Sequence, residues 1–135
     1  MTLHVELLMP DRSLWSGEAG MVIAKTIDGD IGVLSGRAPV FGILSPGSLV
    51  RIQPEAGEES GEEVRAAVRD GFLSVNNDRV SILTSVGLLA DDVEVTAARA
   101  DLDAASAEAG STSAAEESVE VRYARARLRA AGEQA

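Results

Sequence analysis

The chain has 135 residues, enough for one domain or a small domain with an accessory element, and it contains no cysteine. The lack of cysteine excludes disulfides and thiolate chemistry, and the net charge of −10 argues against nucleic acid, because phosphate neutralisation needs Lys and Arg. No apolar run approaches the about 20 residues of a membrane span, so we expect any link to a membrane to be made through a partner.

The start of the chain is predicted to form short strands. Apolar residues alternate with mostly polar ones over residues 3–9, which indicates a half-buried strand. Two further extended runs cover residues 13–17 and 21–26. In the second of these runs, apolar residues point to both faces, so we expect burial on both sides.

Residues 29–39 combine three glycines with Ile31, Val33 and Leu34, and they end in Pro39. Glycine permits positive φ and close backbone approach, whereas proline ends a strand ladder. The segment is therefore predicted to be a tightly turned, half-buried contact loop. A phosphate cradle is the alternative, but the Gly-Lys-Ser/Thr of a P-loop and the following helix are both missing.

The middle of the chain continues with short strands separated by turns. Residues 40–44 and 49–53 are predicted to pair antiparallel through a type II turn that contains Pro46 and Gly47. Residues 62–69 alternate strictly, and residues 72–75 and 80–84 form a hairpin around residues 76–78. This pattern predicts an antiparallel β-sandwich or flattened barrel over residues 1–88.

The last part of the chain, residues 89–135, is predicted to form an α-helical hairpin. One apolar stripe with helical spacing consists of Val95, Ala98, Leu102, Ala105 and Ala109. A capping box at residues 113–116 precedes a second stripe, made of Ala114, Val121, Ala124, Leu128 and Ala131. Gly132 is a suitable residue to end the second helix. Because both stripes are mostly alanine, we expect the hairpin to be weakly held and displaceable.

No catalytic or metal-binding set emerges from the residue pattern. His4 is the only histidine and lies on the polar side of its strand, with no Ser–Asp constellation near it. The aspartates at positions 28, 30, 91 and 92 do not form a calcium loop with a closing Glu. The sequence therefore predicts a protein that is not an enzyme by itself and that has no cofactor.

Arg122, Arg125 and Arg129 recur at steps of three and four, so they share one helix face. Such a face is either solvated or a patch for an acidic partner surface. The spacing alone leaves both interpretations open.

Four stretches resemble the epsilon subunit of the F-type ATP synthase, in actinobacterial forms, and together they span nearly all of residues 3–86. The most specific stretch is Gly29–Pro39, which reads Gly-Asp-Ile-Gly-Val-Leu-Ser-Gly-Arg-Ala-Pro. The others are residues 3–7 with 11–19, residues 44–47, and residues 70–75 with 80–84. The Ala-rich tail with its arginines resembles the family in kind.

The resemblance implies a sandwich of about ten strands followed by a helical hairpin, in the rotor stalk of a proton-translocating ATP synthase. It implies binding to the gamma subunit and the c-ring, on the cytoplasmic face of the cell membrane. Asp30 occupies the family's acidic contact position, and the implied c-ring or gamma contacts are Asp30, Ile31, Gly32, Arg37 and Pro39. Arg37 stands where the family usually has His, which replaces a titratable group by a permanent cation.

The family's C-terminal helices can extend toward the catalytic head and restrain ATP hydrolysis. The resemblance implies that Arg99, Arg122, Arg125 and Arg129 contact acidic segments of the beta subunits, with alpha as a further neighbour. Some bacterial members bind ATP through an Ile/Leu-Asp-x-x-Arg-Ala motif. Thr96 replaces its Asp here, so we assign no ATP site. The rival interpretation is a free-standing β-sandwich that binds a ligand or acts as an adaptor.

Overall fold

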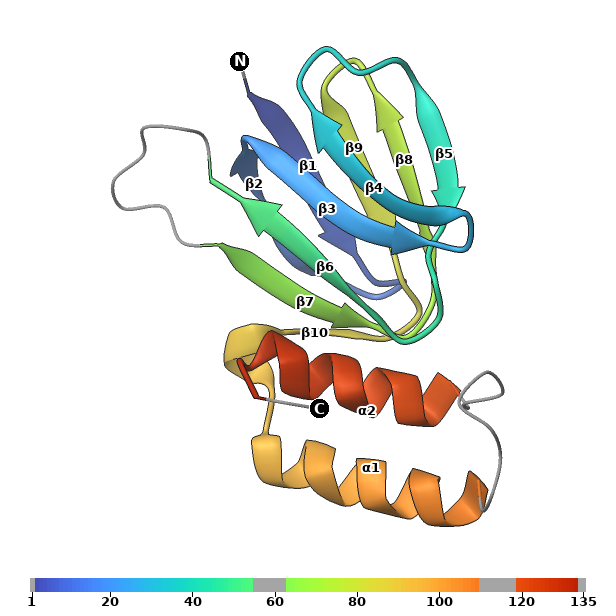
Figure 1. Ribbon diagram of the computed structural model, residues 1–135. Helices are drawn as coiled ribbons and strands as arrows, with labels where there is room; N and C mark the ends of the chain where they lie inside the picture. Colours follow the sequence, from blue (N-terminus) through green and yellow to red (C-terminus); the bar gives the residue numbers. More distant parts are fainter. Residues whose placement is uncertain (1, 55–62, 110–118, 134–135) are drawn as a thin grey trace.

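The computed structural model describes residues 2–54, 63–109 and 119–133, and it is built from two five-stranded sheets and two helices (Figure 1). The order of the first sheet is β2-β1-β9-β8-β5, with β1 (Leu3–Leu8), β2 (Ser13–Ala19), β5 (Val40–Ile43), β8 (Phe72–Asn76) and β9 (Arg79–Leu83). The order of the second is β10-β7-β6-β3-β4, with β3 (Met21–Thr26), β4 (Gly29–Leu34), β6 (Ser48–Gln53), β7 (Val64–Val68) and β10 (Gly87–Leu89).

The two sheets pack face to face around one aliphatic core, so the predicted β-sandwich with a two-helix hairpin is confirmed. Leu3, Val5 and Leu7 of β1 are buried, while His4 and Glu6 point outward, as the alternation predicts. β1 pairs antiparallel with β2 but parallel with β9, so the sandwich is not wholly antiparallel. In β3, Val22 and Ala24 are buried, whereas on the opposite face Met21 and Ile23 are only half-buried and Lys25 is exposed.

The glycine-rich stretch is not the predicted loop. Its first part is strand β4, which pairs with β3 along its whole length, from Thr26 opposite Gly29 to Met21 opposite Leu34. Val33 is buried and Ile31 packs against the core. Their period of two is the strand signal, and the three glycines obscured it.

The predicted hairpin between residues 40–44 and 49–53 is also wrong. β5 pairs with β8 in the first sheet, whereas β6 pairs with β3 and β7 in the second. The Pro46-Gly47 turn therefore carries the chain from one sheet to the other. A tight turn fixes the local change of direction, but it does not fix which sheet the next strand joins.

The hairpin of β8 and β9 is confirmed. Asn76 faces Arg79, which leaves a two-residue turn at Asn77 and Asp78. Their φ values are 50° and 62°, the pair of positive angles that matches the twist of the flanking strands. Asn and Asp tolerate this conformation better than most residues.

A short 3-10 turn, η1 (Ala90–Asp92), leads into α1 (Val95–Ala109), and α2 (Val119–Ala130) returns antiparallel to it. The stripe of α1 is confirmed at Ala98, which is buried, and at Val95, Leu102 and Ala105, which are half-buried. The predicted capping box lies outside the described residues. Gly132, at φ 86°, ends α2 as predicted, and its amide donates to the Arg129 carbonyl at 3.0 Å.

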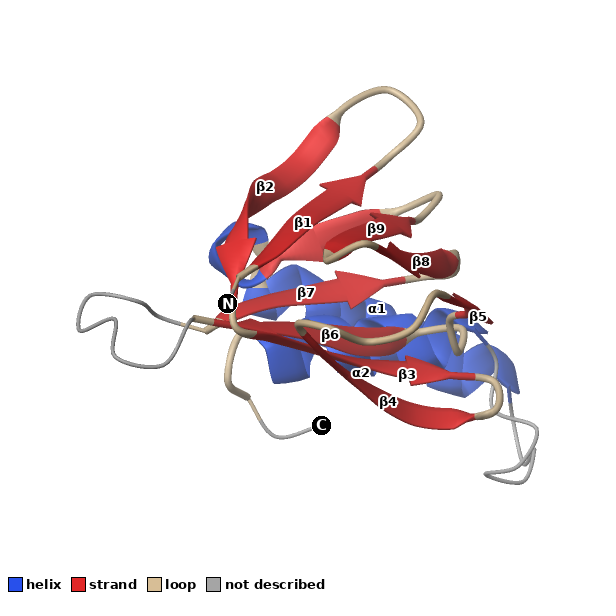
Figure 2. Cartoon of the chain, turned by 90° about the horizontal axis from the view of Figure 1, so that it is seen from above, coloured by secondary structure: helices blue, strands red, loops and turns tan. Residues whose placement is uncertain are grey.

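α2 lies between the sandwich and α1, and its two opposite faces are both buried (Figure 1). One face carries the predicted stripe residues Val121, Ala124 and Leu128. The other carries Tyr123, Ala126 and Ala130, which pack with Ala67 of β7. Seen from above, both helices lie on the side of the sheet that contains β6 and β7, and α2 is the helix that packs on these strands (Figure 2). The apolar spacing in the sequence predicts only the first of these faces.

Candidate functional site

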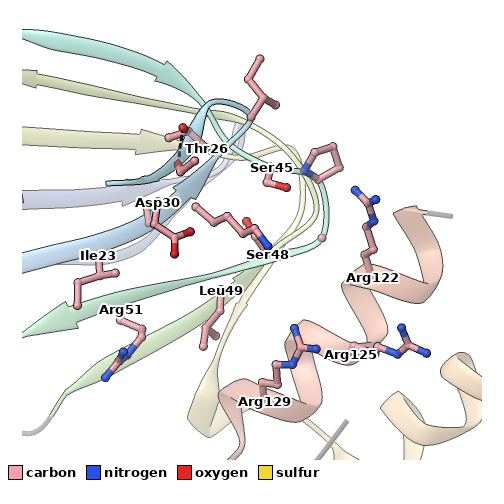
Figure 3. Close-up of a pocket in the computed structure, with 16 residues that line it drawn as sticks. Ile23, Thr26, Asp30, Ser45, Ser48, Leu49, Arg51, Arg122, Arg125 and Arg129 are labelled. Atoms are coloured by element: carbon pink, nitrogen blue, oxygen red, sulfur yellow. Dashed lines mark hydrogen bonds between the residues drawn. The ribbon is translucent and has the colours of Figure 1, made fainter. Parts of the chain in front are cut away.

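The three predicted arginines of α2 do share one face, and they line an open pocket of about 710 Å³ beside the sandwich (Figure 3). Arg129 is exposed, and Arg122 and Arg125 are half-buried. The sandwich side of this pocket is formed by β3, β4 and β6 and includes Lys25, Asp30 and Arg51. The pocket is lined by several cationic side chains, although the chain as a whole is acidic.

Asp30 lies on the exposed face of β4, directly opposite Lys25 of β3. It lines the same pocket as the α2 arginines. The family resemblance implies two different contacts for these residues, one of Asp30 with the c-ring and one of the arginines with the catalytic head. With the hairpin docked, these two sets of residues are neighbours.

The other residues of the predicted contact loop are spread along the sandwich. Gly32 is exposed in the middle of β4, and Ile31 is half-buried. About 13 Å of strand separates Asp30 from Leu34, and Arg37 and Pro39 lie exposed beyond that far end. The five residues therefore do not form one compact site.

The turn after β4 is fastened to the β8–β9 turn by one carboxylate. Asp78 accepts hydrogen bonds from the Gly36 amide at 2.7 Å and from the Ser35 hydroxyl at 2.9 Å. These two bonds hold the pKa of the Asp78 carboxyl below its ordinary value. The segment that carries Arg37 thus has a defined position although its side chains are exposed.

Arg99 lies exposed on α1 and does not line the pocket of the other three arginines. The flank of α2 away from that pocket carries its own contacts. Arg69 pairs with Glu120, and Arg127 pairs with Asp101 of α1 at 2.9 Å. The guanidinium of Arg127 lies 4.8 Å from the centre of the Tyr123 ring, and burial raises the pKa of the Tyr123 phenol.

An apolar patch at the edge strand β5 was not predicted from the sequence. It consists of Phe41, Ile43 and Phe72, whose exposed fractions are 64%, 51% and 37%. The two rings lie 5.2 Å apart, and a pocket of about 560 Å³ beside them is also lined by Pro10 and Leu83. Two of the four aromatic residues of the chain lie here, which is the signal that could have revealed the patch.

A family model described as the β-sandwich domain of the ATP synthase delta/epsilon chain matches residues 2–90. The ATP synthase epsilon chain of Thermobifida fusca is 52% identical over 130 residues, covering 96% of this chain and 91% of the relative. The chain belongs to the ATP synthase epsilon-chain family. The epsilon chain of Streptomyces avermitilis is 39% identical over 125 residues, covering 93% of this chain and 97% of the relative.

The epsilon-chain fold also agrees with a solved structure. A chain in the cryo-EM structure of the Euglena gracilis mitochondrial ATP synthase, OSCP/F1/c-ring, superposes with a TM-score of 0.72 at 19% identity. The match covers 97% of this chain and 79% of that one, so it includes the helical hairpin as well as the sandwich. Among the described residues, no helix is long and apolar enough to cross a membrane.

Proposed function

We propose that this epsilon chain is the non-catalytic central-stalk subunit that links gamma to the c-ring and couples proton flow to ATP synthesis. The observation that carries the proposal is the 52% identity to an ATP synthase epsilon chain over 96% of the sequence. As a member of this family, the chain is a subunit of a membrane-associated complex and is not an enzyme by itself. Family membership replaces the alternative of a free-standing binding module.

The patch formed by Phe41, Ile43 and Phe72 is our candidate for the gamma-binding surface. It lies on the sheet that α2 does not cover. Exposed aromatic and aliphatic side chains that cluster beside a pocket are typical anchors of a protein interface. Arg37 and Pro39 belong to the segment that leads into β5, so we assign them to the gamma contact as well.

The exposed first half of β4 is our candidate for the c-ring contact. Asp30 presents a carboxylate and Gly32 presents bare backbone, while Ile31 holds the strand against the core. The amide of Ile27, in the turn before β4, donates a hydrogen bond to the Ile43 carbonyl at 2.9 Å. This bond joins the start of β4 to the apolar patch. One rigid sandwich would thereby contact both rotor partners, at the cytoplasmic face of the membrane.

The hairpin is proposed to be a regulatory arm, with the division between sandwich and arm near residue 88. Arg99, Arg122, Arg125 and Arg129 would contact acidic segments of the beta and alpha subunits when the arm extends. The face of α2 that meets the sandwich buries Ala126 and Ala130 beside a single large residue, Tyr123, so the apolar area lost when the helices leave the sandwich is modest. We assign no nucleotide or metal to this chain.

Removal of residues 91–135 tests the arm. In membrane vesicles that carry the ATP synthase, we expect this truncation to raise ATP hydrolysis several-fold at saturating ATP, because no arm reaches the catalytic head. Proton-driven ATP synthesis, which depends on the sandwich, is expected to persist. Unchanged hydrolysis in the truncated complex would refute the arm while leaving the coupling role intact.

A further inference from the structure

The turn between β5 and β6 lies against the backbone of α2, and Gly47 is the point of closest approach. Gly47 has a φ of 64°. A Cβ atom placed on it would lie 2.6 Å from the Tyr123 amide nitrogen and 2.7 Å from the Arg122 carbonyl carbon, and it would also meet the Arg122 Cβ. These are atoms of the helix itself, so a rotamer change cannot remove the overlap.

The buried centre of the contact between α2 and the sandwich consists of alanines and one tyrosine. Ala67 of β7 is completely buried against Ala126 and Ala130, with Tyr123 beside them. Dispersion contacts of this kind fall steeply when the surfaces separate by even a fraction of an ångström. A displacement of α2 at Gly47 would therefore weaken the whole contact.

The attachment of α1 depends on the same contact. α1 packs chiefly on α2, and α2 in turn packs on β6 and β7. The ion pair of Arg69 with Glu120 joins α2 to the sandwich near the same end of the helix. Loss of the close approach at Gly47 would thus release both helices together.

We propose that Gly47 is the positioning residue of the docked hairpin, and that its missing side chain is what allows α2 to lie on the sandwich. In the docked state, Gly47 lies against the backbone and Cβ of Arg122, which belongs to the basic face assigned above to an acidic partner. Docking and full engagement of that face are therefore alternatives. This consequence rests on the proposed function of the arm, whereas the docking role of Gly47 does not.

Gly47→Ala tests the proposal in the full chain by hydrogen–deuterium exchange followed by mass spectrometry. We expect amides of residues 119–130 to exchange about tenfold faster or more than in the unmodified chain, with those of residues 95–109 following. Strands of the sandwich are expected to keep their protection. Protection of α2 equal to that of the unmodified chain, or equal loss of protection in the strands, would overturn the proposal.

Two further variants separate the steric effect from backbone strain. Gly36 has a φ of 86° with no atom within 4 Å of an added Cβ, so Gly36→Ala carries a similar backbone cost and should leave α2 protected. Gly47→Asn keeps a residue that tolerates positive φ but adds the Cβ, so it should release α2 as Gly47→Ala does. Release by Gly36→Ala, or a docked α2 in Gly47→Asn, would refute the steric role. None of these measurements involves ATP hydrolysis, so their failure is distinguishable from failure of the regulatory arm.

Discussion

Gly71→Ala is expected to cost about 3 kcal/mol or more of folding free energy and to leave much of the chain unfolded at 37 °C. Gly71 has a φ of 134°, and an added Cβ would collide with the Leu83 carbonyl and lie 2.9 Å from the Thr84 Cα. The Gly71 carbonyl also accepts a hydrogen bond from the Leu44 amide at 2.9 Å. This bond links the segment between β5 and β6, which crosses from one sheet to the other, to the start of β8. Urea denaturation followed by circular dichroism measures the loss.

Gly29→Ala is the matched control for this variant. Gly29 has a comparable φ of 123°, but an added Cβ would meet nothing within 4 Å. It should therefore show only the backbone strain, about 1–3 kcal/mol. Equal stability of the two variants would show that the close packing at Gly71 does not hold β8, β9 and the segment between β5 and β6 together.

Ile43→Ser is expected to weaken binding of the chain to the gamma subunit about 30-fold. Ile43 lies directly opposite Phe72 on the edge strand β5 and lines the same pocket as Phe41 and Phe72, which is the position of an interface anchor. Truncation of such an anchor typically costs about 2 kcal/mol of binding free energy, which corresponds to that change in affinity. The dissociation constant is measured by titrating the chain over gamma subunit that is immobilised on a surface.

Leu34→Ser provides the control for the gamma-binding surface. The side chain of Leu34 is an isomer of that of Ile43 and has a similar exposed fraction, 57% against 51%, but Leu34 lies on the second sheet. We expect its substitution to leave the affinity for gamma within about twofold, since an exposed apolar residue outside an interface contributes little. Equal weakening by both variants, or none by Ile43→Ser, would place the gamma contact elsewhere.

The elements with an unbroken local pattern could be predicted from the sequence. The alternation of Leu3, Val5 and Leu7 determined β1 and its buried face. The Asn77-Asp78 turn and the Gly132 stop rest on backbone angles that few residues adopt, so residue type alone identifies them. The face shared by the α2 arginines follows from helix geometry in the same way.

What could not be predicted depends on contacts between distant segments. Residues 40–53 contain no signal that β5 and β6 join different sheets, because strand pairing is decided by the whole core. The second buried face of α2 is made of Tyr123 and two alanines, which look unremarkable until Ala67 is placed beneath them. The close approach at Gly47 likewise involves residues about 75 positions apart, so the Pro-Gly pair indicated a turn but not its contact.

The central claim is that this chain couples the rotor of the ATP synthase, and its most direct test is reconstitution. Membrane vesicles whose ATP synthase has been stripped of its own epsilon chain are supplied with the full chain, and ATP synthesis driven by an imposed proton gradient is measured. We expect that synthesis is restored, that the chain is recovered with gamma and the c-ring, and that Ile43→Ser requires a higher concentration to reach the same rate. If a saturating concentration of the chain left ATP synthesis at the level of the stripped vesicles, the coupling role would be contradicted.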